Sequence, residues 1–324
     1  MAVLHLPNYR FKHLAVALLF FCKLQALGAW GFEPHRRINQ QACLILPPPL
    51  FGFYKPHIAF MMQHATDPDM RRYVDSLEAG RHFIDLEHFG GNMDSLPMNY
   101  YQAENKYGRL HLLKEGNLPW NIIRNVYLLK NAFSEQNTDK ILKISADLGH
   151  YVADAHVPLH TTENYNGQLS GQKGIHSLWE TLIPNLFIDT LLIPMPEFEY
   201  RKNWTSDIWN CIGESHRYVE TVLQSELHVR NEITESNWYE FQQSKDGVKK
   251  TYSSEYLRLY HKKLNGMVEN RFIASAQLFA QLMYTAWVLA GEPELEELNN
   301  PVTQQNNSQK GTISYPTEVD CNHQ

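Results

Sequence analysis

Cysteine is scarce in this sequence. The 324 residues include four cysteines, and no two of them form a Cys-x-x-Cys pair. This disfavours a thiolate metal site, which gathers cysteines at short spacing. Cys22 falls in a segment that we expect to be removed, and Cys43, Cys211 and Cys321 then permit at most one internal disulfide, whose pairing stays open.

Positive charge is also limited. The chain has 29 Lys and Arg residues against 35 Asp and Glu residues, which gives a formal net charge of -6. This balance disfavours a protein that holds duplex DNA on a basic face. A phosphate-rich substrate would need positive charge from another source, and a metal cluster is one such source.

Long apolar runs, strand signals and internal repeats are few as well. The N-terminal apolar run, residues 14–22, has nine residues, which is fewer than the roughly 20 that a helix needs to cross a bilayer. A second apolar stretch, residues 272–289, contains Gln277 and Gln281. Two amides within it favour a central core helix over a membrane span.

Residues 1–29 have the pattern of an export signal. Arg10 and Lys12 precede the short apolar run, and a small residue, Ala29, ends the segment. Lys23 interrupts the end of the run, and the alternative is an uncleaved anchor, for which the run is too short. We therefore expect cleavage after Ala29 and a secreted or periplasmic mature protein that begins at Trp30.

Helical periodicity dominates the rest of the chain. Apolar residues recur three or four positions apart in residues 34–46, 119–135, 138–157, 204–228 and 252–291, with a break near Asn265-Gly266 in the last range. Residues 299–324 are polar and are expected to be a disordered tail. The predicted fold class is therefore all-α, with a signal peptide (1–29), a single multi-helix domain (30–298) and a tail (299–324).

Histidines and carboxylates recur at helical spacing. His150 and Asp154 lie four residues apart on a predicted helix, which places both side chains on one face. His176 and Glu180 repeat this spacing, and His160 lies just beyond the proline that ends the first helix. A single pair with this spacing is more often part of a solvated helix face. Two such pairs, one of them followed by a further histidine, make a metal site as good an interpretation as a solvated face. Imidazole and carboxylate ligands without thiolate suit zinc or a similar divalent ion.

The order of these elements resembles one known family. The segment His150-Tyr-Val-Ala-Asp154-Ala-His156-Val-Pro158-Leu-His160 resembles the HxxxDxxxPxH signature of the zinc-dependent phospholipase C and single-strand-specific zinc nuclease superfamily. Further resemblances lie in His176-Ser-Leu-Trp-Glu180, in His82-Phe-Ile-Asp85, in Thr-Asp67-Pro, and in Trp30 followed by His35. The resemblance covers residues 30–184 and implies a helical domain of this type, with a metal cluster at the bottom of a cleft.

The resemblance implies three zinc ions per chain. The ligands that it implies are Asp67, His82, His150 and Asp154 for the first ion, His160, His176 and Glu180 for the second, and His35, bridging Asp154 and the amino nitrogen and carbonyl oxygen of Trp30 for the third. A free amine is a good ligand and an internal amide is a poor one. Signal cleavage would therefore be a condition for completing the third site.

The activity that this cluster implies is zinc-dependent hydrolysis of phosphodiesters. Closely spaced zinc ions acidify water and stabilise charge on phosphoryl oxygens. Asp67 is the candidate to orient or deprotonate the attacking water. Asp85 and Asn166 are candidate substrate contacts, although Asp85 is also a candidate to orient His82. Structural roles are expected for His64, His88, His156, Trp179, Trp204, Trp209 and the aromatic residues of 50–62.

The substrate is less defined than the bond that is cleaved. The start Trp30-Gly31, the ending His156 to His160 and Trp179 favour the nuclease branch, whereas Glu180 resembles the phospholipases. Single-stranded nucleic acid or nucleotides, including 3'-nucleotides, are therefore the first expectation and phospholipid head groups the second. A non-catalytic metal-binding secreted protein is the third, and no stable protein partner is predicted.

Overall fold

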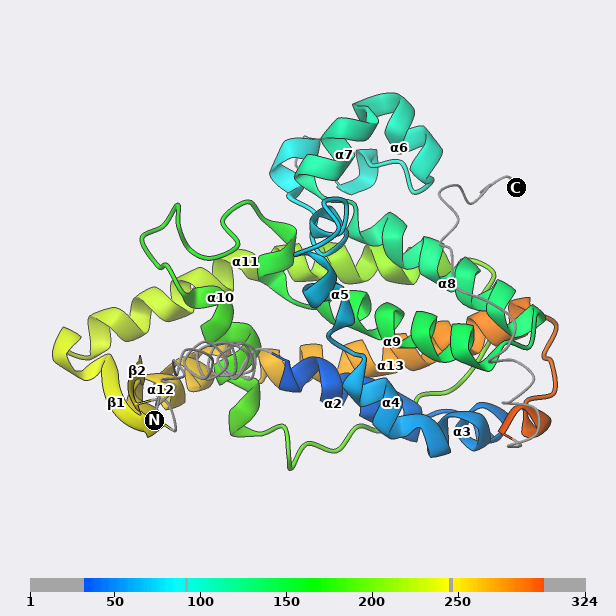
Figure 1. Cartoon of the computed structure of the whole chain (residues 1–324). Helices are drawn as coiled ribbons and strands as arrows, with labels where there is room; N and C mark the ends of the chain where they lie inside the picture. Colours follow the sequence, from blue (N-terminus) through cyan, green and yellow to red (C-terminus); the bar gives the residue numbers. More distant parts are fainter. Residues whose placement is uncertain (1–31, 91–92, 245–246, 300–324) are drawn as a thin grey trace, which may run out of the picture.

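The computed structural model describes residues 32–90, 93–244 and 247–299. The expected signal peptide, the expected ligand Trp30 and residues 300–324 of the expected tail lie outside these ranges. The described part is mostly helical (Figure 1), which agrees with the predicted all-α class. Its strands are confined to one antiparallel hairpin of β1 (Tyr239–Ser244) and β2 (Gly247–Tyr252), in which Tyr239 is opposite Tyr252.

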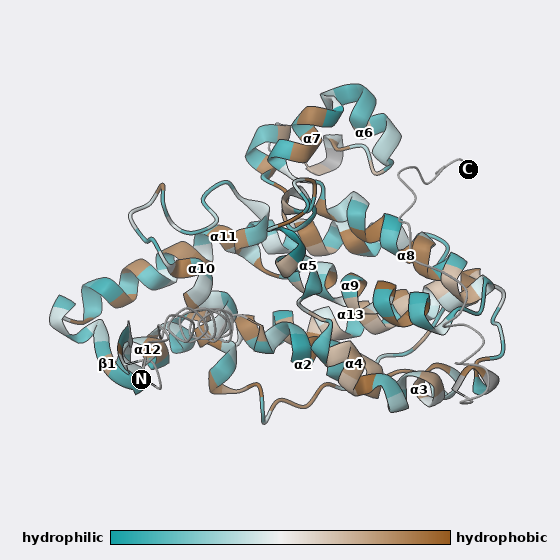
Figure 2. Ribbon diagram, in the orientation of Figure 1, coloured by the Kyte–Doolittle hydropathy of each residue, from teal (hydrophilic) through white to brown (hydrophobic). Residues whose placement is uncertain are grey.

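Five long helices form the body of the protein. They are α2 (Glu33–Leu44), α8 (Leu118–Ser134), α9 (Thr138–Ala155), α11 (Trp204–Glu232) and α13 (Met267–Leu289). Helix α13 packs against α2, α8 and α9, and α8 packs along α9. Figure 2 shows that the long helices carry both hydrophilic and hydrophobic residues, as expected of helices that bury one face.

Helix α13 has the length and hydropathy of a membrane span, but 61% of its most apolar window is buried inside the protein. Phe279, Leu282 and Met283 are completely buried. The prediction of a central core helix is therefore confirmed. The predicted break before it is also found, because Asn265 and Gly266 both have positive φ between α12 (Ser254–Leu264) and α13.

Shorter elements connect these helices. They are α3 (Pro48–Tyr54), α4 (Ile58–Gln63), α5 (Asp67–Arg71), α6 (Tyr100–Tyr107), α7 (Arg109–Glu115), α10 (Ile175–Ser177) and a π-helical turn (Leu178–Leu182). Short 3-10 turns lie at Lys55–His57, Ala79–Arg81, Leu86–Phe89, Met93–Ser95, Pro158–Thr161, Pro184–Leu186, Glu235–Asn237 and Glu296–Asn299. Several of these short elements carry the residues that the sequence analysis singled out.

Two hydrophobic clusters meet at the end of α9. Ala153 and Ala155 belong to the large cluster around α13, whereas Val157 and Leu159 belong to a smaller cluster with residues of α10 and α12. Asp154 lies at this junction. The end of α9 can therefore bring together side chains from both halves of the protein.

A close approach of α2 and α9 also shapes this region. A Cβ atom at Gly149 would lie 2.0 Å from Asn39 Oδ1 on α2 and 2.5 Å from the Phe279 ring on α13. Only glycine fits between these neighbours. This packing brings the first turn of α2 against the histidine of α9 that follows Gly149.

Candidate metal centre

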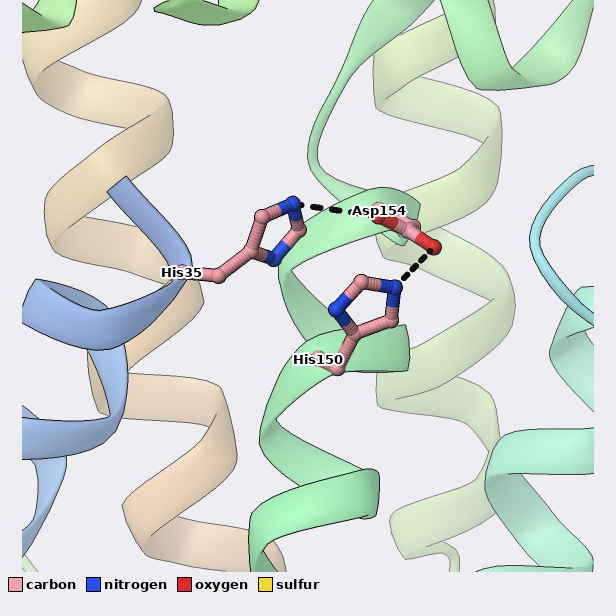
Figure 3. Close-up of side chains that lie close together, drawn as sticks. All are labelled: His35, His150 and Asp154. Carbon is pink, nitrogen blue, oxygen red and sulfur yellow. Dashed lines mark ion pairs between the residues drawn. The ribbon is translucent and has the colours of Figure 1, made fainter. Parts of the chain in front are cut away.

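The innermost group consists of three buried side chains from two helices. His35 comes from the first turn of α2, and His150 and Asp154 come from successive turns of α9. Their imidazoles point toward the carboxylate (Figure 3), with His35 Nε2 at 3.7 Å from Asp154 Oδ1 and His150 Nε2 at 3.4 Å from Asp154 Oδ2. The two rings stack at 4.2 Å between centroids. Two imidazoles therefore converge on one carboxylate.

Two further residues extend this group. His82 Nδ1 lies 3.0 Å from Asp154 Oδ2 and 3.0 Å from His150 Nε2. Asp69 Oδ1 lies 3.8 Å from both of these histidine nitrogens. Two sets of three potential ligands result: His35, His150 and Asp154, and Asp69, His82 and His150.

Asp67 was expected in this position, but the structure places it elsewhere. Its carboxylate is paired with His64 Nδ1 at 2.8 Å, and its side chain is 38% exposed. Asp67 begins the short helix α5, in which residues two positions apart point to nearly opposite sides. Asp69 therefore faces the histidines while Asp67 faces away, and Asp69 rather than Asp67 belongs to a group that could hold a metal ion.

The outer group comes from short elements rather than long helices. His160 lies on the turn Pro158–Thr161, His176 on α10 and Glu180 on the π-helical turn. Glu180 Oε2 lies 2.7 Å from His176 Nε2 and 3.6 Å from His160 Nε2. Glu180 Oε1 lies 3.0 Å from His35 Nε2, so this carboxylate connects the outer group to the inner one.

Backbone carbonyls orient three of the histidines. The Nδ1 atom lies 2.9 Å from the Ala65 oxygen for His150, 2.6 Å from the His82 oxygen for His160 and 3.1 Å from the Tyr165 oxygen for His176. Because a carbonyl only accepts hydrogen bonds, each Nδ1 must carry the proton. Nε2 is then the ring atom that each histidine turns toward the carboxylates, which is the orientation of a metal-binding histidine.

His82 is turned the other way and is supported by a residue that the sequence analysis missed. Its Nδ1 faces Asp154, and its Nε2 lies 3.6 Å from Glu78 Oε1. Glu78 is completely buried and also pairs with Arg71 and Arg81. The spacing Glu78-x-x-x-His82 repeats that of the two recognised pairs, and this signal was available in the sequence.

The electrostatics suit a cation. Burial favours the neutral form of Asp154, but His150 and His160 hold the pKa of this carboxyl well below its usual range. Burial likewise favours neutral His82, but its hydrogen bonds with Asp154 and Glu78 raise its pKa to about 9. The carboxylates are thus ionised, and they favour positive charge beside them, whether it is carried by an imidazole or by a bound cation.

A divalent cation fits this donor set. His160 Nε2 is buried and has no hydrogen-bond partner among the described residues, although it faces Asp154 and Glu180. The third set of potential ligands is His160, His176 and Glu180. Nitrogen and carboxylate donors without sulfur are typical of zinc and related ions. These His, Asp and Glu clusters can hold a metal.

The two expected substrate contacts have different surroundings. The side chain of Asp85 is partly buried, and burial together with the Glu87 and Glu115 carboxylates raises its pKa to about 7. Glu78 rather than Asp85 faces His82, so the supporting role considered for Asp85 belongs to Glu78. Asn166 Oδ1 accepts a hydrogen bond from the Gly174 backbone N–H at 3.0 Å, which closes the loop before α10.

The residues expected to be structural have packing or pairing roles. His156 is buried and its Nδ1 donates to the Val152 oxygen at 2.7 Å. His64 pairs with Asp67, and the exposed His88 pairs with Glu163 at 3.0 Å. The remaining expected core aromatics that are buried in the hydrophobic clusters are Phe53, Tyr54, Trp179, Trp204 and Trp209.

An apolar pocket of about 340 Å³, including space open to solvent, lies beside the centre. His35 and Glu180 are on its wall, together with Pro34 of α2, Trp179 and Phe272. The expected ligand Trp30 precedes α2 by three residues and lies outside the described residues. The pocket is therefore next to the point where the chain enters α2.

Comparisons with known proteins identify no relative: no family model matches the chain, and no curated protein matches its sequence. Any assignment of function therefore depends on the motifs and on the geometry of the centre.

Proposed function

We propose that the protein is a zinc-dependent phosphodiester hydrolase, related to the zinc-dependent phospholipase C and single-strand-specific zinc nuclease superfamily. One observation carries this proposal. His35, His82, His150, His160 and His176 come from separate parts of the chain and turn ring nitrogens toward the carboxylates of Asp69, Asp154 and Glu180. A solvated helix face has no reason to bury these groups together.

Three zinc ions are proposed. The proposed ligands are Asp69, His82, His150 and Asp154 for the first ion, His160, His176 and Glu180 for the second, and His35, Asp154 and the amino end of Trp30 for the third. When bound, the ions supply the positive charge that acidifies water and neutralises phosphoryl oxygens. Glu180 Oε1 lies closer to His35 Nε2 than Asp154 Oδ1 does, so either carboxylate could hold the ion that His35 would bind.

We propose that Asp69 accepts the proton of the attacking water. Its side chain is 24% exposed, whereas that of Asp154 is 1% exposed. A carboxylate that accepts a proton must lie within hydrogen-bond reach of the water that gives it up, and the more exposed Asp69 is better placed than Asp154 to contact that water. Asp154 and Glu180 instead hold the histidines and set the negative charge of the centre.

The freed amine of Trp30 is proposed to complete the third site after signal cleavage and export. His35 lies on the first turn of α2, five residues after Trp30, so the amine is within reach of the same centre. A variant that retains one extra residue before Trp30 is expected to bind one zinc ion fewer by elemental analysis. Full metal content in that variant would remove Trp30 from the ligand set.

Single-stranded nucleic acid and nucleotides are the proposed substrates. Tyr165 is 54% exposed, and its ring lies 6.3 Å from that of His176. An exposed aromatic face beside the metal group is suited to stacking on a base, which tolerates any single-stranded sequence.

Phospholipid head groups are the alternative. Tyr73 and Val74, which follow α5 and its ligand Asp69, are 84% and 86% exposed. Two adjacent exposed apolar side chains, four and five residues after the proposed ligand Asp69, would suit contact with a lipid surface.

The deciding experiment is an assay of the zinc-loaded mature protein, which begins at Trp30. Single-stranded DNA, 3'-nucleotides and phosphatidylcholine vesicles are compared at equal enzyme concentration, with Asp154→Asn as the inactive control. Turnover of DNA or 3'-nucleotides is expected. Turnover of phosphatidylcholine alone would select the lipid alternative. If none of the three substrates is turned over, the protein is a non-catalytic metal-binding protein.

A further inference from the structure

The orientation of His176 depends on the loop of residues 162–174. His176 Nδ1 donates to the Tyr165 backbone oxygen at 3.1 Å. This is the bond that turns Nε2 toward Glu180, 2.7 Å away. Because Tyr165 lies within the loop, the position of the loop determines where the ring of His176 points.

One buried side chain fixes this loop to α11. Gln172 is 4% exposed, and its side-chain amide donates to the Leu223 backbone oxygen at 2.7 Å and to Glu226 Oε2 at 2.6 Å. The nearby loop glycine Gly171 accepts a hydrogen bond from Arg230 at 2.9 Å. The loop is therefore held by α11 at two adjacent positions.

Glu226 is the centre of this contact. It is completely buried, and its two carboxylate oxygens are both used. Oε2 accepts from Gln172, while Oε1 accepts from Arg230 Nε at 2.5 Å and from the Tyr256 hydroxyl of α12. A buried carboxylate is stable only when its charge and oxygens are satisfied in this way. Every donor around it is thus held in one geometry.

We propose that Glu226 is a positioning residue for metal binding by His160, His176 and Glu180. It holds Gln172, which fixes the loop, and the Tyr165 carbonyl of the loop in turn sets the ring of His176. Glu226 acts entirely through these intermediates. This inference requires the metal binding of the proposed function but not its catalytic activity.

The test is the Zn²⁺ affinity of Glu226→Gln, measured with purified mature protein and a competing chelator. A glutamine amide has one acceptor oxygen, so its NH₂ group must face a donor from either Gln172 or Arg230. Loss of a supporting partner of a ligand typically weakens metal binding 10- to 100-fold. We expect a loss of about this size for one ion, with the other ions unaffected.

Tyr256→Phe is the matched control. It removes another hydrogen bond to Glu226 but leaves the contact with the loop in place. It is expected to lower the melting temperature while keeping every Zn²⁺ affinity. Equal weakening of the same ion in Glu226→Gln and Tyr256→Phe would reduce Glu226 to a general stabilising residue and overturn the proposal.

A second variant and a second readout cover the case in which Glu226→Gln does not fold. Gln172→Met keeps the pairing of Glu226 with Arg230 and Tyr256 but removes the contact with the loop, and it should weaken the same ion. Nitrogen NMR of the metal-free protein should show His176 losing its fixed Nδ1–H form. Full affinity in Gln172→Met would overturn this inference alone, whereas a wild-type protein without bound zinc would overturn it together with the proposed function.

Discussion

His150 and Asp154 lie on a regular helix of 18 residues, whereas His176 and Glu180 lie on a three-residue helix that continues into a π-helical turn. The side chains of the first pair are 0% and 1% exposed, and those of the second are 26% and 13% exposed. Each pair thus consists of a histidine and a carboxylate four residues apart, but the two pairs are held in place by different kinds of structure. The long helix holds its two candidate ligands through core packing, whereas the candidate ligands on the short elements depend on hydrogen bonds from a loop.

The two groups are also connected through one backbone atom. His160 of the outer group donates to the backbone oxygen of His82, whose side chain belongs to the inner group. A displacement of His82 would therefore disturb ligands in both groups. This connection makes the centre a single unit despite its two kinds of support.

The largest effect is expected from Asp154→Asn, which tests whether the two groups share one carboxylate. Asp154 lies within 3.9 Å of nitrogens of His35, His82, His150 and His160. Metal content should fall in both groups, and phosphodiester turnover should fall about 1,000-fold, which corresponds to about 4 kcal/mol. Elemental analysis and steady-state kinetics measure this. Loss of only one ion would show that the groups are independent.

The next effect separates Asp69 from Asp67. Asp69→Asn should weaken one ion of the inner group at least about 10-fold, because it removes a charged donor near His82 and His150. Asp67→Asn is the matched control and should keep full metal affinity, since an exposed pair with His64 contributes at most about 1 kcal/mol to folding. Titration with Zn²⁺ under chelator competition distinguishes them. A loss in the Asp67 variant alone would restore the assignment made from the sequence.

A smaller effect tests whether helix packing supports the inner group. Gly149→Ala places a methyl group against Asn39 and Phe279, and should lower the free energy of unfolding by about 1–3 kcal/mol. Gly52→Ala in α3 is the control, because its Cβ would meet nothing within 4 Å. That variant should be neutral or stabilised by up to about 1 kcal/mol. Urea unfolding of both variants measures the difference. Equal free energies of unfolding would show that α2 can shift to make room for the added methyl group.

The smallest effect concerns Asp85, which lies outside both groups. Burial and, to a smaller extent, the Glu87 carboxylate raise the pKa of Asp85 from its ordinary value of 3.8 to about 7. A carboxyl with a raised pKa is disfavoured in its ionised form, so stability falls as pH rises from about 4 to about 7. Asp85→Asn should match the wild type at pH 4 and melt at a higher temperature at pH 8. Calorimetry at the two pH values checks this, and identical melting at pH 8 would contradict it.

The long helices were predictable because their apolar spacing is regular. Helix α8 was expected at residues 119–135 and is found at Leu118–Ser134, and α9 was expected at 138–157 and is found at Thr138–Ala155. The hairpin of β1 and β2 was not predicted. Its strands have six residues each, and Phe241 and Val248 are exposed, so no buried face marks them in the sequence.

The candidate site was predictable where its spacing is local. The spacing of four residues identified His150 with Asp154 and His176 with Glu180. The resemblance pointed to Asp67, and the sequence did not reveal that Asp69 faces the histidines instead, because this depends on which side of the short α5 faces α9. The contact of Gln172 with Glu226 joins residues 54 positions apart, so it depends on how α11 packs against the loop.

The π-helical turn that carries Glu180 has a consequence for how this region can change in length. Such a turn has the form of one residue inserted into an ordinary α-helix. Removing Leu178 or Trp179 would reduce the spacing between His176 and Glu180 from four residues to three, which would shift the Glu180 carboxylate by about 100° around the helix axis relative to His176. A substitution that leaves Glu180 in place keeps this spacing, whereas a deletion before Glu180 would move the carboxylate away from His176 and also displace Pro184, which lines the pocket beside the centre.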